Sequence, residues 1–172
     1  MKKSKVILVL VIIGISLAFV FLYPKISKRY EDKVTHTSYY FPEGWEATHI
    51  TWDQIYTEPV TILKKGLDEI WINRTTKDPK QSYDELVDML TKEGARFADH
   101  LVPIGKLTYY QLAYSYEDIL SERKQTYYEG YFLSRPGEGR LKGYVIALFS
   151  QPETYAQNKE ILRKLVESIR YK

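Results

Sequence analysis

The sequence predicts an α+β fold in which two helices pack against an antiparallel β-sheet, preceded by one N-terminal transmembrane helix. Three observations predict it. An uninterrupted apolar run lies near the amino terminus, several short segments alternate apolar and polar residues, and two longer segments repeat apolar residues at the helical period. These segments follow the order strands, helix, strands, helix, which is typical of an antiparallel sheet covered by helices.

The apolar run begins at Val6, ends at Tyr23 and contains no charged residue. A helix of this length spans about 27 Å, which approaches the thickness of a bilayer's hydrocarbon core. Residues 1–5 contain three lysines and predict the cytoplasmic n-region of an export signal. We therefore expect a transmembrane signal-anchor at residues 6–23, a linker at 24–34 and an extracytoplasmic domain at 35–172.

A signal peptide cleaved after Ala18 is the alternative, because Ser16 and Ala18 have the small-x-small spacing of a cleavage site. Apolar residues continue from Phe19 to Tyr23, where a cleavable signal normally turns polar, and this favours retention of the segment. Basic residues flank both ends of the run almost equally, so the positive-inside rule leaves the orientation open. The lysine-rich first residues favour a cytoplasmic N-terminus, which places residues 30–172 outside the cytoplasmic membrane.

The charge of the chain is divided between the anchor and the domain. The whole chain carries a formal charge of +3, but residues 30–172 hold 19 basic and 22 acidic side chains, a net charge of −3. A nucleic-acid partner is not expected, because such proteins present a cationic face to the phosphates. Cysteine is absent, which excludes disulfides, a thiolate nucleophile and a lipid-modified cysteine.

Seven segments rich in β-branched and aromatic residues predict strands. They are residues 35–41, 45–51, 57–63, 69–76, 108–116, 127–134 and 141–150. Pro42 and Gly44 predict a turn after the first segment, and residues 64–66 and 135–140 predict hairpin turns. The last segment is apolar on both faces, which predicts a central strand.

Two helices follow from capping signals and apolar periodicity. Ser82 and Glu85 have the spacing of a capping box, the apolar stripe of the first helix follows, and Gly94 ends it. Ser150 and Glu153 repeat the capping-box spacing before a second apolar stripe that runs to the carboxyl end. Both stripes predict helices packed on the sheet.

The turn Phe41-Pro42-Glu43-Gly44-Trp45 and a closing helix over residues 162–170 occur together with this order of elements. In these features the chain resembles the PsbP/Mog1-like α/β/α sandwich superfamily over residues 35–171. The resemblance implies a binding or accessory protein without catalytic activity, as in the photosystem II extrinsic subunit and a Ran-GTPase-binding factor. No residue here matches the manganese or chloride role of the photosystem protein.

Signals for catalysis or metal binding are weak. His36, His49 and His100 are the three histidines, and no pair has the spacing of a zinc motif. The adjacent acids at 68–69 and 84–85 do not predict two carboxylates that meet across a cleft. No serine lies in a nucleophile motif, and no glycine-rich loop has a P-loop lysine. We expect no enzyme, no metal and no cofactor.

Tyrosine is the compositional outlier, with 15 of its 16 copies in residues 30–172. Tyr110, Tyr114 and Tyr116 share one face of a predicted strand, and we expect an aromatic binding surface there, with Trp45 or Trp71 nearby. The alternative is that tyrosine is simply the strand-forming and core-edge residue that this chain uses.

These observations together predict a membrane-anchored accessory protein. It would reach the bilayer through Val6–Tyr23 and bind a protein partner in a membrane or envelope complex. A sensor domain for a small ligand or metal is the second hypothesis, and an enzyme is the third. A flat Tyr/Trp face would favour a protein partner, and a concave pocket with converging histidines and carboxylates would favour a ligand.

Overall fold

The fold is seen in a computed structural model that describes residues 29–50, 59–104, 107–118, 124–134 and 143–171. The signal-anchor expected at residues 6–23 and the hairpin turn expected at 135–140 lie outside the described residues. Neither of the two described helices is long and apolar enough to cross a bilayer.

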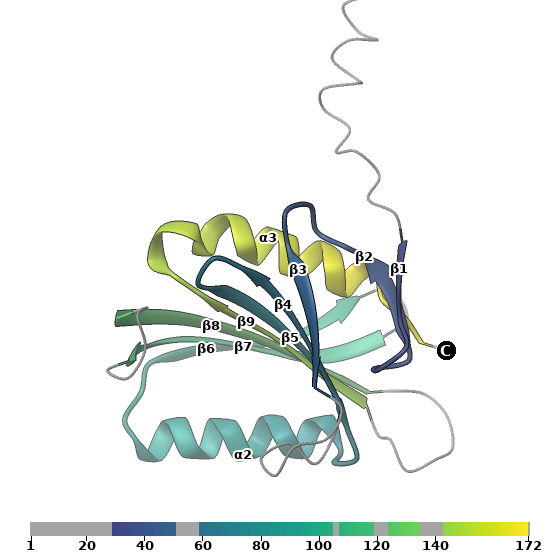
Figure 1. Ribbon diagram of the computed structural model, residues 1–172. Helices are drawn as coiled ribbons and strands as arrows, with labels where there is room; N and C mark the ends of the chain where they lie inside the picture. Colours follow the sequence, from purple (N-terminus) through teal and green to yellow (C-terminus); the bar gives the residue numbers. More distant parts are fainter. Residues whose placement is uncertain (1–28, 51–58, 105–106, 119–123, 135–142, 172) are drawn as a thin grey trace, which may run out of the picture.

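A seven-stranded antiparallel sheet forms the centre of the domain, in the order β3-β4-β5-β9-β8-β7-β6. Its strands are β3 (Glu46–Ile50), β4 (Val60–Lys65), β5 (Asp68–Thr75), β6 (Phe97–Ile104), β7 (Leu107–Asp118), β8 (Lys124–Ser134) and β9 (Gly143–Ser150). Helix α2 (Pro79–Lys92) covers one face and helix α3 (Pro152–Ser168) covers the other, giving three layers (Figure 1). The predicted antiparallel sheet with two packed helices is confirmed.

The register explains why β9 is apolar on both faces. It lies between β5 and β8, with Ile146 opposite Ile72 on one side and Tyr131 on the other. A strand in this position is buried from both sides, so both of its faces need apolar residues. The predicted central position of this segment is confirmed, as are the turns that contain Gly44 and Gly66, where φ is +77° and +61°.

A second, three-stranded sheet was not predicted from the sequence. It has the order β1-β2-β10 and consists of β1 (Arg29–Asp32), β2 (Thr37–Tyr40) and β10 (Arg170–Tyr171). Strand β1 lies within the segment expected to be a linker, so the linker prediction for 24–34 is wrong at residues 29–32. Strands β1 and β10 are too short to show an alternating pattern in the sequence. Their pairing with β2 defines them as strands.

Both helices begin at residues other than those predicted. Asp78 is the N-cap of α2, and its carboxylate accepts from the backbone N–H of Lys80 at 2.8 Å. Ser82 therefore lies inside the helix and is not its cap. The predicted end is confirmed, because Glu93 is the C-cap and Gly94 follows with φ of +70°.

Helix α3 has no capping box. Gln151 is its N-cap and makes no side-chain cap hydrogen bond, while the carboxylate of Asp68 on β5 accepts from the Gln151 N–H at 2.9 Å. The predicted Ser150–Glu153 capping box is wrong, because Ser150 instead hydrogen-bonds to Asp68 at 2.9 Å. The helix ends at Ser168, before the carboxyl end of the chain.

Candidate functional site: an aromatic row on the α2 face

Strand alternation decides which tyrosines face α2. Tyr110, Tyr114 and Tyr116 lie at alternate positions of β7 and project from the face that α2 covers. Tyr110 stacks on Tyr83 of α2 with ring centroids 4.9 Å apart and packs against the small core beneath that helix. Tyr110 therefore helps to hold α2 to the sheet.

Tyr114 and Tyr116 belong to a continuous row of rings that crosses four strands. The row runs from Trp71 on β5 through Phe149 on β9 and Tyr128 on β8 to these two tyrosines on β7. Successive ring centroids are 5.5, 5.3, 4.7 and 5.8 Å apart. These are the tilted and edge-to-face distances that aromatic pairs prefer. We call these five residues the aromatic row.

Trp71 forms the β5 end of the row and is tied to a charged pair. Its indole N–H donates to a carboxylate oxygen of Glu69 at 2.8 Å, and Lys64 forms an ion pair with the same carboxylate at 3.0 Å. At its β5 end, the row therefore contacts the ion pair of Glu69 and Lys64.

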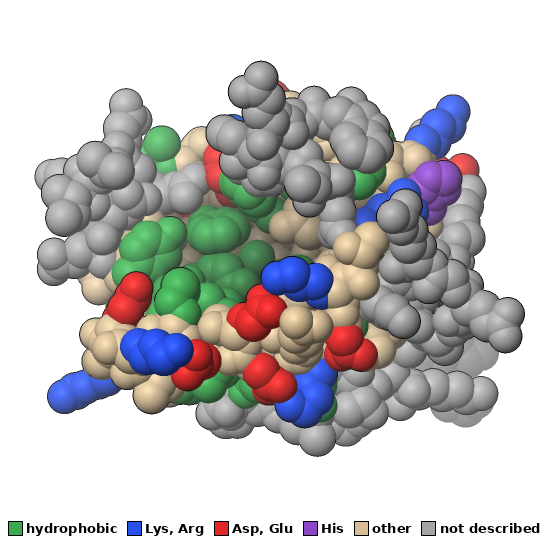
Figure 2. Space-filling model, turned by 90° about the horizontal axis from the view of Figure 1, so that it is seen from below, with side chains coloured by type: hydrophobic (Ala, Val, Ile, Leu, Met, Phe, Trp, Pro, Cys, Tyr) green, Lys and Arg blue, Asp and Glu red, His purple; other side chains and the backbone are tan. Residues whose placement is uncertain are grey.

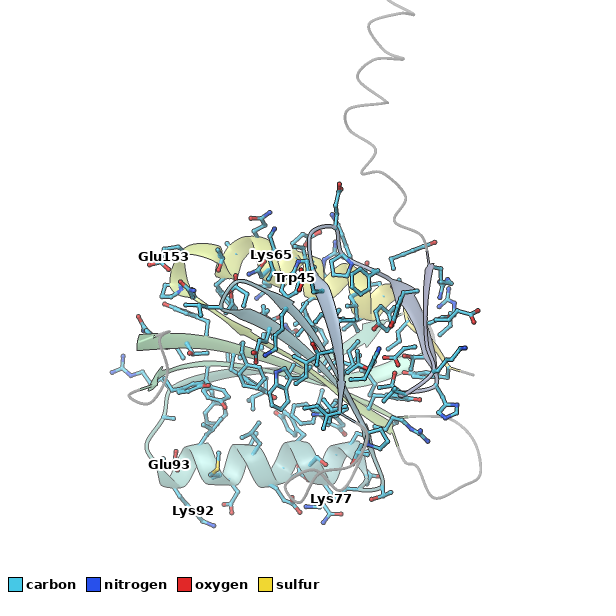
Figure 3. All side chains as sticks on the ribbon, viewed as in Figure 1. Trp45, Lys65, Lys77, Lys92, Glu93 and Glu153 are labelled. Atoms are coloured by element: carbon cyan, nitrogen blue, oxygen red, sulfur yellow. The ribbon has the colours of Figure 1, made fainter. Side chains whose placement is uncertain are left out.

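Trp45 does not join the row. It lies on the opposite side of the sheet from α2 (Figure 3), is 5% exposed and belongs to the main core that packs against α3. Of the five candidate residues, the structure therefore brings together Trp71, Tyr114 and Tyr116, leaves Tyr110 beside them under α2, and separates Trp45.

Phe149 and Tyr128 complete the row and were missed by sequence reasoning. Both lie in predicted strands, and the sequence does not show that they join the other rings, because neighbours on adjacent strands are set by register. Tyr128 pairs with Phe149 on one side and with Tyr114 on the other. A hairpin register derived from turn lengths could have found this alignment.

Gly130 makes room for the Tyr128 ring. A Cβ at Gly130 would lie 2.4 Å from the Tyr128 hydroxyl oxygen and 2.8 Å from two of its ring carbons. The ring therefore lies across the glycine, between Tyr114 and Phe149. Glycine is required here for close approach of a side chain to the backbone.

Gly130→Ala is expected to displace the Tyr128 ring and lower the free energy of unfolding by about 1–2 kcal/mol, the usual cost of overpacking. Chemical denaturation of the variant measures the loss, and near-ultraviolet circular dichroism reports the changed aromatic packing. Ala147→Gly is the matched control, because it also changes the chain by one methyl group, on the neighbouring strand, without adding a clash. An unchanged aromatic spectrum in Gly130→Ala would contradict this packing.

The row lies on the face of the sheet that is hollowed when viewed from the α2 side. From the α2 side, apolar side chains gather in a hollowed area beside a line of acidic and basic side chains (Figure 2). Trp71, Phe149, Tyr114 and Tyr116 are half-buried there, while Tyr128 is only 6% exposed. Met89 on α2 is 44% exposed and is one of the few exposed large apolar side chains among the described residues.

The hydroxyls of Tyr114 and Tyr128 are neutral at physiological pH. Burial raises the pKa of Tyr114 to about 12, with smaller contributions from Tyr116 and from the negative charge of Glu93. Burial also raises the pKa of Tyr128, with smaller contributions from Tyr114 and Tyr116. The hollow therefore offers apolar ring surface and uncharged hydroxyls, which suit an apolar or aromatic group with a polar edge.

His36 and His49 are not part of this row, and His100 lies on β6, where its backbone pairs with Gln111 of β7. His49 on β3 is bonded within 3.0 Å of the Tyr30 hydroxyl and of Thr61 Oγ1, and His36 is exposed in the β1–β2 turn. Among the residues whose side chains are described, no three His, Asp or Glu side chains form a group that could hold a metal ion.

A buried carboxylate on the α3 face was also missed. Glu129 on β8 is fully buried and accepts from Gln111 at 2.6 Å, Tyr131 at 2.9 Å and Tyr155 at 2.8 Å, while the Lys159 ammonium lies 3.2 Å away. Burial and the hydrogen bond to Glu129 raise the pKa of Tyr155. A glutamate flanked by tyrosines at 127, 128 and 131 was the sequence signal. Gln111 and Tyr131 lie on the sheet and Tyr155 and Lys159 lie on α3, so the cluster joins α3 to the sheet.

No protein-family model and no curated protein matches the sequence. A similar solved structure is the solution structure of cyanobacterial PsbP (CyanoP) from Synechocystis sp. PCC 6803. The two chains are 10% identical with a TM-score of 0.49, and the match covers 88% of this chain and 96% of that chain.

Proposed function

We propose that this chain is a membrane-anchored accessory protein of the PsbP/Mog1-like kind, which binds a protein partner through the aromatic row and performs no catalysis. The apolar run at residues 6–23 would hold it in the cytoplasmic membrane with the domain outside. The partner would belong to the same membrane or envelope complex.

The observation that carries this proposal is the half-exposed aromatic row beside α2. Tryptophan and tyrosine are the residues in which binding energy concentrates at protein interfaces, because they bury large area at a small entropic cost. Here four such rings and Phe149 are held in contact by strand register, so the surface is ordered before a partner arrives. An apolar segment of the partner fits a hollow of this composition.

Site-specific photo-crosslinking tests the proposal in native membranes. A photoreactive amino acid replaces Met89, an exposed residue of α2, the helix that covers the face on which the row lies. The full-length chain that carries it is expected to form an adduct of one defined mass. Glu160, which is about half exposed on the opposite helix, is the matched control position and is expected to form none. Equal adducts from both positions, or no adduct from position 89, would contradict a partner at the row.

Trp71→Ala in the Met89 crosslinking chain is expected to reduce the adduct at least ten-fold, because loss of an interface tryptophan that contributes strongly to binding costs about 1.4 kcal/mol or more. Leu67→Ala, which removes an apolar side chain that is 37% exposed outside the row, is the control and should leave the adduct unchanged. A strong thermal stabilisation by a metabolite or metal ion, without any protein adduct, would instead favour a ligand sensor.

A further inference from the structure

The β1–β2–β10 sheet presents exposed basic and aromatic groups at the point where the described chain begins. Arg29, Lys33, Arg170 and Tyr40 are exposed, and Tyr40 retains 44% of its surface. Arg29 and Tyr40 are opposite each other across β1 and β2, and Arg170 is opposite Ser38 two positions along. We propose that this sheet docks on the anionic headgroups of the bilayer that holds the anchor. The inference rests on the proposed anchoring at residues 6–23.

The length of chain between the apolar run and β1 limits how far the sheet can stand from the membrane. Six peptide units separate Tyr23 from Arg29, and fully extended chain advances at most about 3.6 Å per residue. Strand β1 therefore begins within about 22 Å of the end of the anchor. This edge of the domain is close to the headgroups whatever the orientation of the anchor.

Charge favours contact between this sheet and an anionic surface. The exposed charged side chains of this sheet and of the β1–β2 turn are three basic residues and one acidic residue, Glu31. Asp32 is buried, with 1% exposure. The rest of the domain is acidic, since residues 30–172 carry a net charge of −3. An anionic surface would attract the sheet and repel the acidic remainder, which gives the domain a preferred orientation.

The surface is held rigidly enough to dock as a unit. The Arg29 guanidinium donates at 3.0 Å to the backbone oxygen of Ser38 and to that of Ser168, at the carboxyl end of α3, and lies 5.1 Å from the centre of the Tyr40 ring. The backbone N–H of Tyr40 donates to Ser168 Oγ at 2.9 Å. An arginine paired with a tyrosine ring suits the headgroup region, where aromatic side chains concentrate.

The experiment uses the full-length chain in lipid nanodiscs. Because the sequence contains no cysteine, Tyr40→Cys and Lys92→Cys each give a single labelling site. A fluorophore at position 40 is expected to be quenched by headgroup-linked quencher more strongly in discs that contain phosphatidylglycerol than in phosphatidylcholine discs. Lys92, at the end of α2 (Figure 3), is the control and should show no such difference.

Lys33→Gln with Arg170→Gln removes two charges and spares the hydrogen bonds that Arg29 makes. Each basic residue near an anionic bilayer contributes about a five-fold factor, so the docked fraction relative to the undocked should fall about 25-fold in the double variant. About 1 M salt, with a Debye length of about 3 Å, should reverse the quenching in the same way.

Equal quenching at position 40 in both kinds of disc, with the protein still inserted, would overturn the docking surface and leave the anchor standing. Failure of the unmodified chain to float with vesicles after carbonate extraction would instead overturn the anchor. Quenching that depends on phosphatidylglycerol but is unchanged in the double variant would place the contact outside this sheet and would also overturn the inference.

Discussion

Glu129→Ala is expected to lower the free energy of unfolding by about 3 kcal/mol, since buried donors that lose an acceptor each cost about 1–3 kcal/mol. The substitution leaves the hydroxyls of Tyr131 and Tyr155 and the amide of Gln111 without the carboxylate that they share. Lys159 adds little to the cost, because its side chain is 48% exposed and can return to water.

Thermal and urea denaturation of the full-length chain measure this loss, which corresponds to a fall in Tm of about 6–12 °C for a domain of this size. Glu129→Gln keeps the shape of the side chain and an acceptor oxygen, so it should cost less than alanine. Lys92→Ala is the control for an exposed pair, because Lys92 and Asp88 are 73% and 65% exposed and such a pair is worth less than about 1 kcal/mol. A similar Tm for all three variants would contradict a buried network at Glu129.

Asp68→Ala is expected to destabilise the chain by about 2–3 kcal/mol, the combined effect of a lost helix cap and lost buried hydrogen bonds. The Asp68 carboxylate is 5% exposed and accepts at 2.9 Å from Ser150 Oγ, the Gln151 N–H and Thr154 Oγ1. It thus supplies from β5 the cap that the α3 sequence itself lacks. Its loss should release the first turn of α3.

Amide hydrogen exchange distinguishes this effect from a general loss of stability. In Asp68→Ala, exchange at the first turn of α3 should accelerate more than exchange in α2. Asp78→Ala is the matched control: Asp78 caps α2 from within its own segment, so its removal should cost about 1 kcal/mol and act on α2. Uniform acceleration in both helices would show that Asp68 does not act as the cap of α3.

The sequence located the helices better than their starts. Apolar periodicity predicted α2 and α3, but Ser82 and Ser150 have the capping-box pattern without being caps. In α2 the true cap, Asp78, precedes Pro79, which is well suited to the first helical position. In α3 the capping carboxylate comes from a strand more than 80 residues earlier. A cap supplied from another element leaves no local pattern to detect.

The candidate site was likewise only partly predictable from the sequence. Period-two spacing placed Tyr110, Tyr114 and Tyr116 on one face, because side chains on any strand alternate. The spacing could not show that Trp71 would join Tyr114 through Phe149 and Tyr128, or that Trp45 would lie on the other side of the sheet. Those relations depend on strand order and on the β5–β9–β8–β7 register.

The sequence by itself determined the α+β class, the two helices, most strands of the large sheet and the acidic character of the domain. These properties follow from local periodicity and composition, which each segment shows without reference to the segments that it contacts. Tertiary structure decided the small β1–β2–β10 sheet, the cap of α3, the burial of Glu129 and the aromatic row. Each of these joins residues far apart in the chain, and only the register and packing of the folded strands bring them within contact distance.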